Sequence, residues 1–207
     1  ERRSILGGLL LRGDEERIRD FHSGLHMEIY ITINMGKHMT FDGIPMIGLV
    51  RRARQVLRGP NRVGEAPVRA ASDAESRVLA VLEEAQKSGN TYRNVPVVDG
   101  RTLRLLAECM GARKVIEIGT STGLSGMWLS LALMRTGGKL VTFEHDPERA
   151  AAARANFEKA GVASLVTVVE GDAHEMIGSV EGPIDLVFID GDKPGYCFYL
   201  TSLLPLV

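Results

Sequence analysis

The stretch KVIEIGTSTG, residues 114–123, decides the fold of this chain. Val115, Ile116 and Ile118 in its first half are apolar and β-branched, which is typical of a strand buried on both faces of a parallel sheet. Gly119 ends the strand, and Gly123 precedes an apolar run over residues 124–134 that predicts a helix. A strand, a tight turn and a helix N-terminus together present free N–H groups to a ligand. The spacing is G-x-x-x-G and not the G-x-G-x-x-G of the dinucleotide fingerprint, which argues against NAD.

Two acidic residues accompany this turn. Glu117 stands inside the first strand, where a carboxylate is costly unless it meets a donor or a cation. Residues 139–145, KLVTFEH, predict the next strand, and Glu144 lies near its C-terminal end, where an open α/β sheet binds ligands. Asp146 and Pro147 then predict the N-cap and first residue of a helix. The distance of Glu144 from the glycine turn fits an acid that holds ribose hydroxyls.

Longer motifs resemble one family. The chain reads EIGTSTGLS, then VTFEHDPERAAAARANFEKAG, then EGDA, then IDLVFIDGDKPGY. Their order and spacing, over residues 95–207, are similar to those of the metal-dependent O-methyltransferases of the catechol and caffeoyl-CoA type. The resemblance implies an α/β, Rossmann-like class I methyltransferase with a mostly parallel seven-stranded sheet and helices on both faces. It also implies transfer of a methyl group from S-adenosylmethionine to a hydroxyl of a catechol-like, phenolic small molecule.

The resemblance assigns roles to individual residues. It places the following in the cofactor site: Glu117, Gly119, Thr120, Ser121, Gly123, Ser125, Glu144, His145, Gly171, Asp172, Ala173 and Asp190. Asp190 matches the family's first metal carboxylate, and Lys193, three residues later, matches its general base. Such an enzyme must align the hydroxyl oxygen with the methyl group, which can be worth roughly 7–11 kcal/mol. A cation, Mg²⁺ or another divalent ion, would stabilise the phenolate of a chelating diol.

The expected metal site departs from the family pattern. The family's other ligands are an Asp-Asn pair directly after a Gly-Gly strand, whereas this chain reads Arg12-Gly13-Asp14. Asp14 is the candidate for one carboxylate ligand, and the amide partner is absent. This departure leaves open a cofactor-binding protein that does not catalyse.

The order of the segments is unusual. The family's chain continues beyond a segment like LLPLV, residues 203–207, through a Gly-Gly strand, a helix and two strands. Here the corresponding pieces stand at the N-terminus: GGLLL at residues 7–11, an amphipathic helix over 15–26, a strictly alternating strand over 27–34 and the start of a last strand at 39–41. We therefore predict a circular permutation. The alternative is a truncated domain with an unrelated extension, which would expose a hydrophobic sheet edge.

The permutation divides a single domain, residues 1–207, into three parts. Residues 1–42 correspond to the family's C-terminal part, 43–71 are a joining segment, and 72–207 hold the N-terminal helices and the cofactor-binding half. We expect residues 9–11 to form a buried parallel strand beside residues 187–189, and Glu1 to lie near Val207.

Composition limits the other possibilities. The chain has 207 residues, 44% of them hydrophobic, which suits one domain with a real core. With 25 basic against 26 acidic residues, no general attraction to nucleic acid or to anionic membranes is implied, and no apolar run approaches a membrane span. A basic run at residues 51–58 is the feature that would favour the alternative substrate, a hydroxylated base in RNA. The two cysteines, Cys109 and Cys197, favour a reducing, cytoplasmic setting, and a homodimer is a further expectation.

Overall fold

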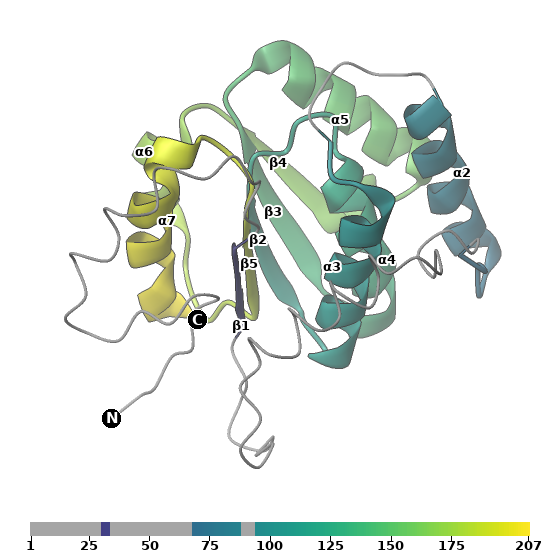
Figure 1. Ribbon diagram of the computed structural model, residues 1–207, viewed down its shortest axis with the longest axis horizontal. Helices are drawn as coiled ribbons and strands as arrows, with labels where there is room; N and C mark the ends of the chain where they lie inside the picture. The colour runs from purple at the N-terminus through teal and green to yellow at the C-terminus, as the bar shows by residue number, and fades with distance from the viewer. Residues whose placement is uncertain (1–29, 34–67, 88–93) are drawn as a thin grey trace, which may run out of the picture.

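The computed structural model describes residues 30–33, 68–87 and 94–207. These residues form one sheet with helices on both faces (Figure 1). The strands and longer helices are β1 (Tyr30–Ile33), α2 (Asp73–Lys87), α3 (Val97–Cys109), β2 (Lys114–Ile118), α4 (Leu124–Thr136), β3 (Lys139–Glu144), α5 (Pro147–Ala160), β4 (Val166–Glu170), α6 (Ala173–Met176), β5 (Leu186–Ile189) and α7 (Tyr196–Leu203). Short 3₁₀ turns stand at Ala163–Leu165, Ile177–Ser179, Lys193–Gly195 and Leu204–Leu206.

The sheet has the strand order β1-β5-β2-β3-β4. β5, β2, β3 and β4 are parallel, as their connecting helices require, and β1 is antiparallel to β5. The chain moves from β2 to β3 and β4 on one side, and places β5 on the other side of β2. Ligands of open α/β sheets bind at such a reversal of strand order, outside the carboxyl ends of the strands. The α/β, Rossmann-like class predicted from the sequence is confirmed.

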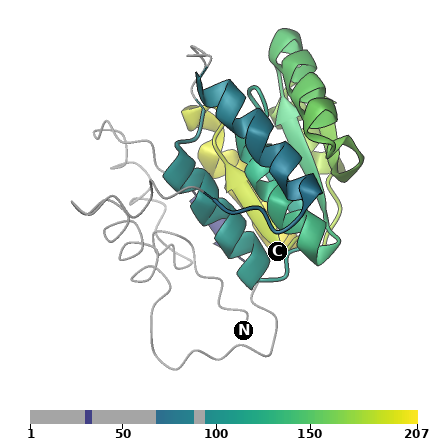
Figure 2. The same ribbon diagram turned by 90° about the vertical axis from the view of Figure 1, so that its right-hand side faces the viewer.

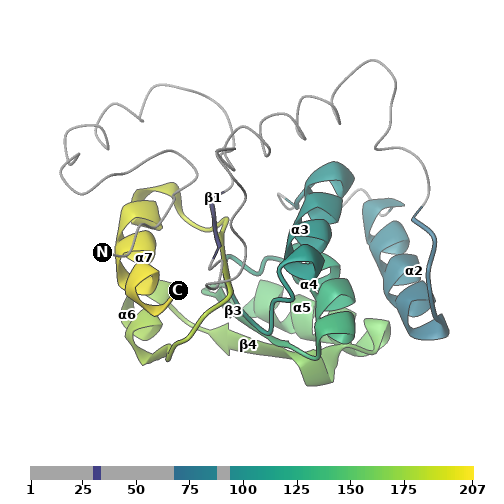
Figure 3. The same cartoon turned by 90° about the horizontal axis from the view of Figure 1, so that it is seen from below.

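Two hydrophobic layers cover the sheet. One face carries α2, α3, α4 and α5, and the other carries α6 and α7 (Figure 3). The first core includes Val78, Leu103, Met127 and Phe157; the second includes Ile177, Tyr199 and Leu203. α2 packs on α5 and α4 and is the outermost helix of its layer (Figure 2). Burial on both faces explains why the parallel strands read as apolar runs in the sequence.

The helix ends follow from local chemistry. The side chain of Asp146 accepts hydrogen bonds from the backbone N–H groups of Glu148 and Arg149, at 2.9 and 3.1 Å, so the N-cap predicted for α5 is confirmed. At α2, the hydroxyl of Ser72 accepts a hydrogen bond from Glu75 N at 3.2 Å, which is one half of a capping box. The carboxylate of Glu75, however, accepts from the backbone of Ala71 and not from Ser72.

β1 is the one described element among residues 1–42, and it tests part of the predicted arrangement. β1 lies within the strand predicted over residues 27–34, is antiparallel and places Thr32 opposite Val187. The position beside residues 187–189 is thus occupied by β1, and the expected pairing of residues 9–11 there is wrong, because the other edge of β5 is bound to β2. Residues 9–11 and Glu1 themselves lie outside the described residues. The described part of the chain contains five of the seven expected strands.

Candidate functional site

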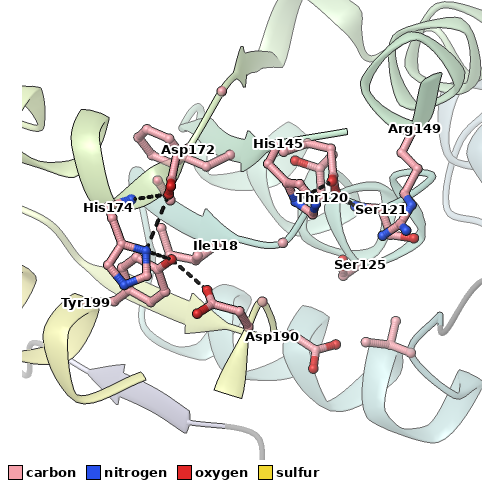
Figure 4. Close-up of a pocket in the computed structure, with 18 of the residues that line it drawn as sticks. Ile118, Thr120, Ser121, Ser125, His145, Arg149, Asp172, His174, Asp190 and Tyr199 are labelled. Atoms are coloured by element: carbon pink, nitrogen blue, oxygen red, sulfur yellow. Dashed lines mark hydrogen bonds and ion pairs between the residues drawn. The ribbon is translucent and has the colours of Figure 1, made fainter. Parts of the chain in front are cut away.

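A cavity of about 720 Å³ lies where β2, β3, β4 and β5 end, at the reversal of strand order (Figure 4). Most of the residues expected in a cofactor site line it: Gly119, Thr120, Ser121, Ser125, Glu144, His145, Gly171, Asp172, Ala173 and Asp190. Glu117 and Gly123 are not among the lining residues. Lys193 is exposed and does not line the cavity either. Asp14 lies outside the described residues.

The turn after β2 forms one wall of the cavity, and both of its glycines are needed. Gly119 has φ +98°, and a Cβ there would come within 2.7 Å of the carbonyl oxygen of Asp190. Gly123 has φ +87° at the start of α4, and a Cβ there would meet the ring of Phe157 at 2.8 Å. Ser121 also has a positive φ, +49°, which is uncommon for a residue with a side chain. This backbone brings β2, β5 and the start of α4 into close contact.

Glu144 is held against this turn by backbone donors. It is 4% exposed; one carboxylate oxygen accepts from Ser121 N at 2.7 Å, and the other accepts from Asp146 N at 3.1 Å. His145 lies beside it, with Nδ1 3.3 Å from the same carboxylate. The acid therefore keeps a fixed orientation at the cavity wall, and its remaining lone pairs can accept further hydrogen bonds.

Glu117 lies under the cavity and is completely buried. In the parallel register it stands opposite Thr142, whose hydroxyl donates to its carboxylate at 2.6 Å. The Thr142 hydroxyl is also 2.6 Å from the hydroxyl of Thr120. Burial raises the pKa of Glu117 to about 7; the hydroxyls of Ser125 and Thr142 oppose this shift, and the carboxylates of Asp190 and Glu144 reinforce it. Three carboxyl groups thus gather at one end of the cavity, an environment that favours a cationic ligand.

Asp190 follows β5 and faces the glycine turn, with its backbone N–H donating to Ile118 O at 2.9 Å. Burial, the main cause, and the carboxylate of Asp99 together raise the pKa of Asp190 to about 6, and the ammonium of Lys193 opposes this shift. Asp99 stands on the first turn of α3, which begins at Val97.

The opposite end of the cavity holds a network that the sequence did not predict. His174, Asp192 and Tyr199 all line the cavity and are joined by hydrogen bonds (Figure 4). The network reaches Asp172, which was expected and caps α6 by accepting from His174 N at 2.8 Å. His174 follows β4, whereas Asp192 and Tyr199 follow β5, so no single motif indicates that these residues lie together.

Asn94 connects the segment before α3 to the glycine turn. Its side-chain oxygen accepts from the hydroxyl of Thr122 at 3.1 Å and from that of Ser121 at 3.5 Å. Asn94 and its neighbour Val95 both line the cavity.

The described residues do not complete a metal site. Among them, no group of three or more His, Cys, Asp or Glu side chains is arranged to hold a metal ion. Asp190 is the one expected ligand within the described ranges.

Comparison with known proteins agrees with this geometry. The model of a family described as O-methyltransferase matches residues 69–207. The chain belongs to this O-methyltransferase family. The matched region contains the whole cavity and all described residues except β1 and Val68.

Individual members of the O-methyltransferase family are similar in sequence and structure. A catechol O-methyltransferase of Niastella koreensis is 35% identical over 136 residues, which are 64% of this chain and 61% of the relative. The crystal structure of cofactor-bound Rv0187 from MTB superimposes with a TM-score of 0.59 at 35% identity, over 72% of this chain and 68% of that one. The O-methyltransferase TomG of Streptomyces achromogenes, in complex with SAM, gives a TM-score of 0.56 at 33% identity, over 66% of this chain and 61% of that one.

The chain spans about three fifths of the length of the first of these relatives. Within the described ranges, no helix combines the length and the apolar character that crossing a bilayer requires.

Proposed function

We propose that this protein is an S-adenosylmethionine-dependent O-methyltransferase that methylates a hydroxyl of a catechol-like small molecule. The observation that carries the proposal is the fixed carboxylate of Glu144 beside the glycine turn, in a cavity of about 720 Å³ that also contains Asp190. The names of the similar proteins support the catechol-like class, and the SAM in the TomG structure supports the cofactor.

The chain's own residues suggest an orientation for the cofactor. The carboxylate of Glu144 would accept hydrogen bonds from both ribose hydroxyls. The carboxylate of Asp172, at the far end of the cavity, would accept a hydrogen bond from the adenine amino group. The methionine part would then lie over the glycine turn, where the carboxyl groups of Glu117 and Asp190 favour its positive charges. The other expected residues that line the cavity would form the walls of this site: Gly119, Thr120, Ser121, Ser125, His145, Gly171 and Ala173.

In the proposed reaction the hydroxyl oxygen of the substrate attacks the methyl carbon in line with the C–S bond. The O–CH₃ bond forms as the S–CH₃ bond breaks, and the sulfonium becomes a neutral thioether. Lys193, as a neutral amine, would take the hydroxyl proton and later release it to water. The turn Lys193–Gly195 begins three residues after Asp190, and this short separation in the chain supports the role proposed for the lysine.

A divalent cation is part of the proposal. Its chemistry would be to stabilise the phenolate form of the substrate. Asp190 would be one ligand: its carboxyl group is largely desolvated and repelled by Asp99, and a cation would relieve both effects. Further oxygen ligands would have to come from outside the described residues, where Asp14 is the candidate, or from water and substrate.

We also propose the circular permutation, with residues 1–42 as the family's C-terminal part and 43–71 as a joining segment. An antiparallel strand from the N-terminal part at the β5 edge of the sheet supports it. Cys109 and Cys197 are free and exposed, which supports a cytoplasmic setting; a homodimer stays a prediction.

The test is a methylation assay with a panel of catechols, SAM and Mg²⁺. We expect turnover that is abolished by excess chelator and reduced about 100-fold or more in Asp190→Ala. Full turnover in chelator would show that the metal part is wrong. Absence of turnover in a protein that binds S-adenosylhomocysteine (SAH) with ordinary affinity would favour the non-catalytic alternative.

A further inference from the structure

Two segments around the cavity are joined by hydrogen bonds that the proposed reaction does not use. The segment after β4 carries Asp172, which is the N-cap of α6, and His174, which lies within α6. The segment after β5 carries Asp192 and Lys193. Tyr199 of α7 lies between them and is 2% exposed (Figure 4). Its hydroxyl is 2.6 Å from Asp192 Oδ1 and 2.9 Å from His174 Nδ1.

The arrangement fixes where the protons lie. The single proton of the Tyr199 hydroxyl is donated to the carboxylate of Asp192. His174 Nδ1 faces the tyrosine oxygen and, at 3.3 Å, Asp172 Oδ1, and both of these atoms are then acceptors. Nδ1 must therefore carry a proton, because an unprotonated Nδ1 would face two acceptors without a donor. Burial and the hydrogen bond to Asp192 raise the pKa of Tyr199, which keeps its hydroxyl protonated.

Each end of this hydrogen-bond network is fixed to the backbone of a segment at the cavity. Asp172 is held by both the backbone N–H and the ring of His174. Asp192 accepts from Gly195 N at 2.9 Å and so closes the turn Lys193–Gly195 that carries the lysine. Gly195 packs on the network itself: a Cβ there would come within 2.7 Å or less of Tyr199, Asp192 and His174.

We propose that Tyr199 and His174 are positioning residues that couple recognition of the adenine by Asp172 to the placement of Lys193. The inference rests on the proposed function, since it assigns adenine to Asp172 and the base to Lys193. When adenine binds, it restricts the position of the Asp172 carboxylate and, through it, of the His174 ring. The hydrogen bond from His174 then restricts the Tyr199 hydroxyl, which holds Asp192 and the turn Lys193–Gly195 in place. The coupling is carried by hydrogen bonds, so it disappears when a single donor is removed, although the rings remain packed.

The chain offers matched variants for a test. Tyr199→Phe removes only the hydroxyl, and Thr201→Val removes a hydroxyl from the same helix that donates only to backbone carbonyls of that helix. His174→Leu removes the Nδ1 donor, whereas His174→Asn keeps a donor near that position. The His174 side chain is 40% exposed, so substitutions there disturb the core little. The two His174 variants therefore test the coupling even if Tyr199→Phe fails to fold.

The first measurement is SAH binding by calorimetry, and the second is the NMR signal of the Lys193 side chain with and without SAH. We expect SAH to shift this signal in the wild type, Thr201→Val and His174→Asn, and to produce less than about a third of that shift in Tyr199→Phe and His174→Leu. SAH affinity in the latter two should fall by no more than about tenfold, the value of one hydrogen bond. Nitrogen NMR should show a proton on Nδ1 of His174 in the wild type.

Three outcomes would overturn the coupling. One is a Lys193 shift in SAH-bound Tyr199→Phe equal to that of the wild type, and the second is a His174 ring protonated only on Nε2. The third is a wild type that does not bind SAH, which calorimetry detects first and which would also refute the proposed cofactor site. Normal binding without coupling would refute this inference alone.

Discussion

Glu117, which we propose favours the positive charges of the cofactor, is unfavourable for stability once it ionises. Its carboxyl group is fully buried, and its pKa is raised to about 7, mainly by burial, from an ordinary value of 4.5. A carboxyl group with a raised pKa in the folded state binds more protons there than in the unfolded chain. The free energy of unfolding should therefore fall as pH rises from about 4.5 to about 7, by on the order of 3 kcal/mol.

The variant Glu117→Gln tests this effect in the cofactor-free protein. The variant keeps a side-chain oxygen that can accept the hydrogen bond from the Thr142 hydroxyl, and it removes the negative charge of the carboxylate. We expect urea unfolding at pH 8 to show a more stable protein, with a smaller loss of stability between pH 5 and pH 8. Equal pH slopes in wild type and variant would mean that Glu117 does not ionise in this range.

At the scale of elements, the ion-pair network around the start of α2 joins three helices. Glu75 of α2, 3% exposed, contacts Arg104 of α3 at 3.1 Å and Arg135 of α4 at 3.3 Å, and Glu108 contacts the same two arginines. Burial opposes ionisation of Glu75, but the Ala71 N–H and Arg104 outweigh it and lower its pKa. The stability from this charge is present above about pH 4.5 and is lost as pH falls through the lowered value.

Glu75→Gln should destabilise the protein at pH 7 by about 1–3 kcal/mol, because the arginines lose a partner in a partly desolvated site. The variant should lose part of its acid sensitivity as well. Glu83→Gln is the control, since Glu83 is on the same helix in an exposed pair with Lys87 and should leave the unfolding midpoint unchanged. Equal effects of the two variants, measured by urea unfolding, would contradict the role of the network.

The elements also show what the sequence could and could not predict. β2, β3 and β5 were predictable because strands buried on both faces need apolar, β-branched residues, and α5 because Asp146 and Pro147 mark its start. The start of α3 was not predictable: Val97 and Val98 are β-branched, and Gly100 is unfavourable in a helix. Packing overrides this preference, because any Cβ at Gly100 would come within 2.2 Å of the indole ring of Trp128.

The residues of the candidate site also fall into a predictable and an unpredictable group. The glycine turn, Glu144 and Asp190 were predictable because each stands at the end of a recognisable strand. The link from His174 to Tyr199 and Asp192 was not predictable, because the closeness of these residues depends on how α6 and α7 pack.

At the scale of the whole molecule, the permutation predicts that the order of the segments can be restored. A chain that runs from Ser72 to Val207, continues through a flexible glycine-serine linker and ends with residues 1–42 should fold, because the same contacts are formed. We expect its circular dichroism spectrum and its SAH affinity to match those of the native order. A rearranged chain that is unfolded or cannot bind SAH, beside a native chain that does, would favour truncation with an unrelated extension.

The central claim is that the cavity between the glycine turn and Glu144 binds S-adenosylmethionine, and calorimetric titration with SAH tests it most directly. We expect the wild type to bind one equivalent, and Glu144→Ala to lose at least about tenfold in affinity, because hydrogen bonds from ribose to a carboxylate are worth about 1.5–3 kcal/mol each. Glu148→Ala, which removes an exposed carboxylate four residues away, should bind as the wild type does. Wild-type affinity in Glu144→Ala, or no binding by the wild type, would contradict the claim.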